Sequence, residues 1–269
     1  MTQPKTYETD SGTIRYWVDA TAESSIWLVF LPGLTADHRL FDKQMEYFSG
    51  RVSCLVWDPP AHGESRPYPL DFTMDDLANM VFGILDAEGI KHPVLVGQSM
   101  GGYISQAFID LYPGRAVGFV SVDSAPLKRK YYPTWEVKFL RHTKGMYASI
   151  PWALLKPWGT RGAAETDYGR SLMRAFMDNY TKREYVDLAA YGYRILADAV
   201  EADRAYDLDC PVLLLCGKKD HAGDVKAFNR KWAVGENLPL VWVPNAGHNA
   251  NADAPDFVNS HIERFVSLL

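Results

Sequence analysis

Cysteine is scarce in this sequence of 269 residues, and what little there is forms no recognisable framework. Cys54, Cys210 and Cys216 are an odd number of thiols, with neither a CxxC pair nor a Cys/His spacing that would bind zinc. The pattern argues against a disulfide scaffold and against a structural zinc site. We expect these thiols to be reduced and buried.

Targeting segments, long apolar runs and clusters of basic residues are also missing. The first residues lack the basic region and apolar run of a secretory signal, and no run approaches the roughly 18 apolar residues of a membrane span. The net charge is -5 with scattered basic residues, which gives no footprint for nucleic acid or anionic lipid. These absences predict a cytoplasmic protein that acts on a small molecule, without a nucleic-acid partner or membrane insertion. The oligomeric state stays open.

Short apolar, β-branched runs alternate with amphipathic segments along most of the chain. The runs SIWLVFLPG, VSCLVWD, PVLVGQS, AVGFVSVD, PVLLLCGKKD and PLVWVPNAGH are typical of strands buried on both faces. Residues 13–18 alternate like an edge strand, and Asp37 and Thr73 are placed to cap helices. The alternation predicts an α/β fold with a doubly wound, mostly parallel sheet. Helical spacing is present in five segments: 37–48, 74–88, 100–111, 224–234 and 254–268.

This alternation breaks between about Leu127 and Tyr206, where the spacing is helical, Tyr and Trp are frequent and no convincing strand is found. A structureless loop of about 80 residues would be improbable. We therefore expect a helical cap over residues 127–206, inserted into a core made of residues 1–126 and 207–269. Its aromatic side chains either pack the cap onto the core or line a substrate pocket. The candidate substrate contacts are Gln98, Trp135, Trp152, Trp158 and Tyr191.

The stretch from Val94 to Tyr103, VLVGQSMGGY, places Ser99 between a predicted strand and a predicted helix. A sharp turn at that junction leaves little room around the serine, and Gly97 and Gly101 supply that room. The turn raises the hydroxyl above the carboxyl edge of the sheet, where ligands bind in open α/β folds. A G-x-S-x-G pattern between strand and helix is the signature of a nucleophile elbow.

With this elbow the sequence resembles the α/β-hydrolase family, and the resemblance extends over essentially the whole chain. Four further segments match in the family's order. Residues 31–34, LPGL, resemble the oxyanion loop, although many members have His-Gly where this chain has Pro-Gly. Residues 58–65, DPPAHGES, resemble the D-x-x-G-H-G-x-S turn, Asp220 follows a third strand, and NAGH at 245–248 follows the last strand.

A serine hydroxyl is a weak nucleophile at neutral pH and needs a base, which in turn needs an acid to orient it. His248 stands where the family has its base, and Asp220 gives the chain order Ser, Asp, His of this fold. Asp123 is a rival for the acid. It ends the predicted strand of the run AVGFVSVD, which follows the helix after Ser99, and some members of the family have the triad acid at that position. Asp224 is a third candidate.

The same resemblance assigns the backbone N–H groups of Leu34 and Met100 to an oxyanion hole, which stabilises charge on a substrate carbonyl oxygen. The helix that begins at Met100 would add the positive end of its dipole there. His62 lies in a motif that shapes a turn in the family. We expect Asp58 and Ser65 to cap the backbone of that turn.

Taken together, these residues predict a serine hydrolase of the carboxylesterase type that cleaves a small or medium ester through an acyl-enzyme on Ser99, without a metal or organic cofactor. A serine in the elbow argues against haloalkane dehalogenase and epoxide hydrolase chemistry, which needs a carboxylate there. Fold alone does not select the reaction. The alternatives are a C–C bond hydrolase, a lyase or a cofactor-free dioxygenase of the same family, or a small-molecule receptor that retains the triad.

Overall fold

An eight-stranded sheet forms the middle of the protein in a computed structural model that describes residues 4–269. The strand order is β1-β2-β4-β3-β5-β6-β7-β8. Strands β3 to β8 run parallel to one another, and β2 is antiparallel to both of its neighbours, β1 and β4. The doubly wound, mostly parallel sheet predicted from the sequence is thereby confirmed. The strands are β1 Lys5–Thr9, β2 Gly12–Asp19, β3 Trp27–Leu31, β4 Ser53–Trp57, β5 Pro93–Gln98, β6 Gly118–Val122, β7 Val212–Gly217 and β8 Leu240–Val243.

The edge of this sheet differs from the prediction. Residues 13–18 lie in β2, which pairs with β1 on one side and β4 on the other, so they are not an edge strand. The edge on this side is β1, which the sequence did not reveal because KTYET is largely exposed and offers only a half-buried Tyr7 as an apolar signal. The other edge is β8, where three of the four residues are half-buried, so the prediction that this strand is buried on both faces is wrong. An edge strand that buries so little lacks the hydrophobic pattern that identifies inner strands.

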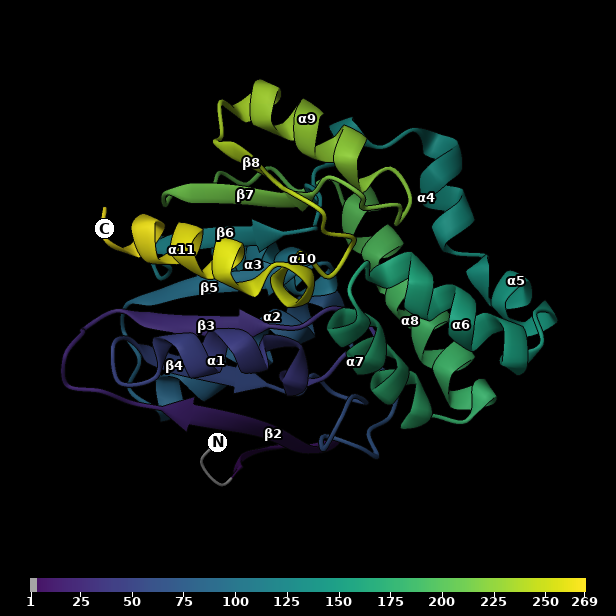
Figure 1. The fold of residues 1–269 in the computed structure, drawn as a ribbon, viewed down its shortest axis with the longest axis horizontal. Helices are drawn as coiled ribbons and strands as arrows, with labels where there is room; N and C mark the ends of the chain where they lie inside the picture. The colour runs from purple at the N-terminus through teal and green to yellow at the C-terminus, as the bar shows by residue number, and fades with distance from the viewer. Residues whose placement is uncertain (1–3) are drawn as a thin grey trace.

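Helices cover both faces of the sheet, and each of the five predicted helical segments is confirmed. Figure 1 shows α1 and α11 in front of the sheet and α2 and α3 behind it. The predicted caps also form: Asp37 accepts a bond from Arg39 N, and Thr73 forms a capping box with Asp76. The bounds are η1 His38–Phe41, α1 Asp42–Phe48, α2 Met74–Ala87, α3 Met100–Leu111, α9 Val225–Glu236, α10 Ala250–Asp253 and α11 Pro255–Val266.

Between β6 and β7 the chain is helical, and the described range 127–206 holds no strand. Figure 1 shows these helices gathered at the end of the sheet to which the arrowheads of β3 and β6 point, the carboxyl end of the parallel strands. A division into a separate cap domain and core stays a prediction, because buried residues of both join one hydrophobic cluster. The helices are η2 Arg129–Tyr131, α4 Thr134–Leu140, α5 Thr143–Ser149, α6 Trp152–Ala163, α7 Asp167–Asp178 and α8 Lys182–Glu201.

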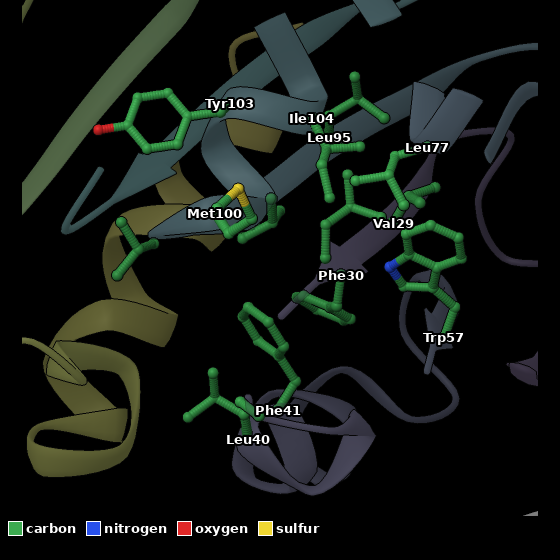
Figure 2. Close-up of a cluster of buried hydrophobic side chains, with 14 of the residues drawn as sticks. Val29, Phe30, Leu40, Phe41, Trp57, Leu77, Leu95, Met100, Tyr103 and Ile104 are labelled. Atoms are coloured by element: carbon green, nitrogen blue, oxygen red, sulfur yellow. The ribbon is translucent and has the colours of Figure 1, made fainter. Parts of the chain in front are cut away.

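Four of the inner strands are buried along their whole length: every residue of β4, β5, β6 and β7 is buried. Figure 2 shows how Val29, Trp57 and Leu95 of the sheet meet Ile104 of α3 in one cluster. Full burial of such a side chain contributes about 1.5–3 kcal/mol each, which fixes the ends of the strands firmly in space. All three thiols are free; Cys54 and Cys216 are buried as expected, whereas Cys210 is only half-buried.

Candidate active site

Ser99 is the single residue between the end of β5 and the start of α3, and its backbone is strained. Its φ of 50° and ψ of -114° lie outside the regions that a residue with a side chain normally adopts. Bonds on both sides hold this conformation: Ser99 N donates to Val122 O at 2.9 Å, and Ser124 Oγ donates to Ser99 O at 2.7 Å. Strain that the surroundings enforce in this way is typical of functional residues.

The glycines around the serine are required by close backbone crossings, as the sequence predicts. A Cβ on Gly97 would lie 2.3 Å from the carbonyl oxygen of Gly101, and one on Gly101 would lie 1.8 Å from that of Leu31. A Cβ on Gly33 would lie 3.1 Å from the Cβ of Ser99, so the loop after β3 runs directly beside the serine. Any larger residue at these positions would displace the elbow.

Ser99, His248 and Asp220 form one continuous chain of contacts. His248 Nε2 lies 2.9 Å from Ser99 Oγ, and His248 Nδ1 lies 3.0 Å from Asp220 Oδ2. The second oxygen of Asp220 accepts a bond from Ala222 N at 2.8 Å. Since a carboxylate only accepts, Nδ1 carries the imidazole proton and Nε2 is free to take the proton of the serine.

The electrostatic surroundings of His248 favour its charged form. Burial lowers the pKa of His248, but the charge and hydrogen bond of Asp220 and the charge of Asp123 outweigh it, so the net pKa is raised above its ordinary value. The side chain keeps 15% of its surface exposed. These carboxylates therefore stabilise the positive charge that the imidazole gains when it removes a proton from serine.

The rival acids are placed elsewhere. Asp123 is fully buried and accepts bonds from Gly217 N at 2.6 Å and Ala250 N at 2.9 Å. Burial and the charge of Asp220 raise the pKa of Asp123. Asp224 precedes α9. The structure thus brings Asp220, rather than either rival, to the ring of the histidine.

Two backbone N–H groups next to Ser99 are available to a ligand. Among the described residues 4–269, no acceptor is bonded to the N–H of Leu34 or Met100. Met100 is the first residue of α3, where N–H groups have no partner within the helix and the helix dipole is positive. Their role as an oxyanion hole stays a prediction.

The predicted substrate contacts have different surroundings. Gln98 is 2% exposed, and its amide donates to the carbonyl oxygen of His248 at 2.7 Å, so it anchors the histidine loop. Tyr191 donates its hydroxyl to Phe72 O at 2.6 Å, and Trp152 packs on Tyr185. Substrate binding by any of these residues stays a prediction. Two of the candidates are largely exposed to solvent, Trp135 at 65% and Trp158 at 58%.

The turn at residues 58–65 is held by its own side chains, as predicted. Asp58 accepts bonds from His38 N at 2.6 Å and Glu64 N at 2.7 Å, and Ser65 Oγ donates to Asp58 O at 2.7 Å. His62 is buried, with Nδ1 2.9 Å from Pro60 O. Burial lowers the pKa of His62 to about 4, so this ring is neutral at neutral pH.

Two buried groups of the described residues bring together atoms of the kinds that bind metals, within 4.8 Å of one another. Their carboxylates already accept hydrogen bonds: Asp58 from two backbone N–H groups and Asp123 from two more. Each of these two carboxylates thus already holds two backbone N–H groups in place. The groups are Asp37, His38 and Asp58, and Asp123, Cys216 and Asp220.

Two polar residues beside the histidine were not identified from the sequence. Asn249 Oδ1 accepts from Gln98 at 3.3 Å, and Asp253 accepts from Gly247 N at 2.8 Å. The available signal was a polar stretch, HNANAD, between the last strand and a helix that starts at Pro255. Such a stretch predicts a loop and a cap, but not which distant N–H groups it meets.

Comparisons with known proteins agree with this fold. The sequence profile of the alpha/beta hydrolase family matches residues 28–261. The chain is 24% identical over 257 residues to 2-(acetamidomethylene)succinate hydrolase of Mesorhizobium japonicum, covering 89% of this chain and 87% of that protein. It is 24% identical over 248 residues to 3-oxoadipate enol-lactonase 2 of Acinetobacter baylyi, covering 88% and 86%. A solved hydrolase from Pseudomonas aeruginosa superposes with a TM-score of 0.82 at 16% identity, over 98% of each chain, which shows a shared fold.

None of the helices within residues 4–269 has the length and apolar content needed to cross a bilayer.

Proposed function

This chain belongs to the α/β-hydrolase family, and on that premise we propose that it is a serine hydrolase that cleaves a small or medium carboxylic ester through an acyl-enzyme on Ser99. The observation that carries the proposal is the contact chain from Ser99 Oγ to His248 Nε2, at 2.9 Å, and from His248 Nδ1 to Asp220, at 3.0 Å. A strained serine, a base and an acid in hydrogen-bond sequence are what acyl transfer requires.

Acylation begins when Ser99 Oγ attacks the ester carbonyl carbon while its proton passes to His248 Nε2. Negative charge then develops on the carbonyl oxygen, and the N–H groups of Leu34 and Met100 stabilise it. Asp220 stabilises the imidazolium and keeps its ring oriented. The tetrahedral intermediate collapses as the C–O bond to the leaving alcohol breaks and the alkoxide takes the proton from Nε2.

Deacylation repeats these steps with water as the nucleophile. His248, neutral again, removes a proton from a water molecule that attacks the acyl carbon. The intermediate expels Ser99 Oγ, which recovers its proton from Nε2, and the carboxylic acid leaves. The cycle thus needs only one base, which alternates between its two protonation states.

The name of one relative and the composition of the helical segment support an ester substrate. One of the relatives is named as a lactonase, and a lactone is a cyclic carboxylic ester. The apolar and aromatic side chains of the helices above the sheet would suit an apolar acyl or alcohol portion. We also propose that the protein works in the cytoplasm.

The test is steady-state hydrolysis of p-nitrophenyl esters from acetyl to dodecanoyl, with Ser99→Ala beside the wild type. Ser260→Ala, an exposed serine on α11, is the matched control. We expect many turnovers per molecule in the wild type and in Ser260→Ala, and none in Ser99→Ala. Mass spectrometry after treatment with a fluorophosphonate should place the adduct on Ser99.

Three results would contradict the proposal. Ester turnover that survives Ser99→Ala would remove the serine from the mechanism. A wild type that releases about one product per molecule and then stops would favour the receptor alternative, and a fluorophosphonate adduct without any ester turnover would favour one of the other reactions of the family.

A further inference from the structure

The loop that carries His248 is tied to the helical segment on both sides of the histidine. On the far side, Asn249 N donates to Ala163 O, the last residue of α6, at 2.8 Å. On the near side, the link runs from Gly247 N to the carboxylate of Asp253. The backbone N–H groups immediately before and after His248 are therefore both connected to the end of α6 and the turn that follows it, the one before His248 through Asp253.

Asp253 lies at the centre of this connection, because one carboxylate receives four donors from two separate segments. Oδ2 accepts from Gly247 N at 2.8 Å and from Glu165 N at 2.9 Å. Oδ1 accepts from Thr166 N at 2.9 Å and from Thr166 Oγ1 at 2.8 Å. Bonds from N–H and O–H groups to a charged acceptor are roughly twice as strong as bonds between neutral partners.

From this geometry we infer that Asp253 is a positioning residue for His248, through which the turn between α6 and α7 helps to set the position of the base. The inference rests on the proposed function, in which His248 is the base. A displacement of about 1 Å at a reacting group is enough to cost about 100-fold in rate. Fixing the peptide before the histidine is a direct way to prevent such a displacement.

Other anchors of the same loop come from the sheet, which makes the contribution of Asp253 separable. Gln98, at the end of β5, holds the carbonyl oxygen of His248, and Asp123, beyond β6, holds Ala250 N. The charges that act on the ring of His248 are those of Asp220 and Asp123. Removing the charge of Asp253 would therefore change the histidine through its position, and not through a direct charge interaction.

The local structure is shaped to admit this carboxylate. Thr166 is the N-cap of α7: its Oγ1 accepts from Gly169 N while it donates to Asp253. A Cβ on Gly169 would lie 2.6 Å from Asp253 Oδ1, so only glycine lets the first turn of α7 come this close. The negative charge also stands at the positive end of the α7 dipole.

The experiment compares Asp253→Asn, Thr166→Val and the control Asp256→Asn, an exposed acid in the first turn of α11. Asn keeps the size of Asp253 but cannot accept from all four donors. Val removes the hydroxyl of Thr166, which donates to Asp253 and also caps α7 by accepting from Gly169 N. We expect kcat on the preferred ester to fall about 10- to 100-fold in Asp253→Asn, with KM within about threefold, because the reacting geometry and not binding is changed. Thr166→Val should lose several-fold and Asp256→Asn nothing.

A second readout does not depend on activity. The Nδ1 proton of His248, which is bonded to Asp220, gives a downfield NMR resonance that reports the geometry of that bond. We expect this resonance to shift or broaden in Asp253→Asn and to stay unchanged in Asp256→Asn. If the wild type hydrolyses no ester, the proposed function fails, yet this resonance still tests whether Asp253 positions His248.

Two results would overturn the inference. A purely structural Asp253 predicts a lower melting temperature for Asp253→Asn with kcat and the His248 resonance both unchanged well below that temperature. If Asp253→Asn does not fold, Thr166→Val decides: wild-type kcat and an unmoved resonance in that variant would refute the positioning role.

Discussion

The parallel sheet and the helical segment 127–206 are built from the same apolar residues but use them differently. Strands β4 to β7 bury every side chain, whereas the helices leave large apolar side chains in solvent. Residues that follow fully buried strands are held in fixed positions. The outer surface of the helical segment makes fewer contacts with the rest of the protein. Among the described residues, six of the nine exposed large hydrophobic side chains belong to this segment: Trp135, Phe139, Met146, Leu154, Trp158 and Tyr168.

The two regions nevertheless meet at the candidate site. Ser99, Asp220 and His248 all follow strands of the sheet, yet a Cβ on Gly192 of α8 would lie 2.4 Å from Leu34 Cδ1. The helix therefore packs directly on the loop that carries Leu34, the predicted oxyanion donor. Along with the contacts of Asp253, this shows where the helical segment 127–206 reaches the residues held by the sheet.

The largest expected effect lies in the residues held by the sheet. Ser99→Ala and His248→Ala should each lower kcat/KM by about 10⁴- to 10⁶-fold, and the double variant should lose little more, because the residues act as a unit. Steady-state kinetics on the preferred ester would measure this. Losses that multiply in the double variant would show that the two residues act independently.

The acid comes next. Asp220→Asn should lower kcat by about 10⁴-fold, because the amide favours the wrong imidazole tautomer. In the wild type, kcat/KM should fall as the pH drops through the raised pKa of His248, since the base must be neutral. That acid limb should move to lower pH in Asp220→Asn. Asp224→Asn is the control, and an equal loss there would argue against the assignment of Asp220.

A pair of leucines tests the contrast in packing. Leu95→Ala in β5 removes a fully buried side chain and should lower the free energy of unfolding by about 2–5 kcal/mol. Leu154→Ala in α6, where the side chain is 62% exposed, should change it by less than about 0.5 kcal/mol. Urea unfolding of both variants measures the difference. Similar losses would mean that the two regions do not differ in the way described.

Acid sensitivity provides the smallest effect. In the unfolded chain His62 binds a proton as the pH falls through its ordinary value, whereas in the fold it stays neutral until about pH 4. The unfolded state then holds more protons, so this group removes about 2 kcal/mol of stability between neutral pH and about pH 5.

The matched variants are His62→Gln and His92→Gln, of which the second changes an exposed histidine. Urea unfolding at neutral pH and at about pH 5 should show a smaller pH-dependent loss in His62→Gln than in the wild type. A loss of the same size in all three proteins would assign the acid sensitivity to other groups.

Helices and strands with a clear hydrophobic periodicity could be predicted from the sequence. The choice between hydrogen-bond partners that lie far apart in the sequence could not. The helices at 74–87 and 100–111 and the inner strands carry patterns that local physics reads directly. Asp123 and Asp220 both follow neighbouring strands, so only the folded backbone decides which one faces His248. Three of the four donors to Asp253 belong to Glu165 and Thr166, which are 88 and 87 residues away in the sequence. No local sequence pattern predicts a contact over that distance.

The buried thiols give the protein a practical property. Burial raises the pKa of Cys54, Cys216 and Cys210, that of Cys210 to about 12, so almost no thiolate is present at neutral pH and alkylating reagents find little to attack. A cysteine introduced at an exposed position of α4 or α6 would then take a fluorophore or spin label selectively. The native cysteines would therefore add little background labelling, and spectroscopy on such a variant would test whether those helices move relative to the sheet.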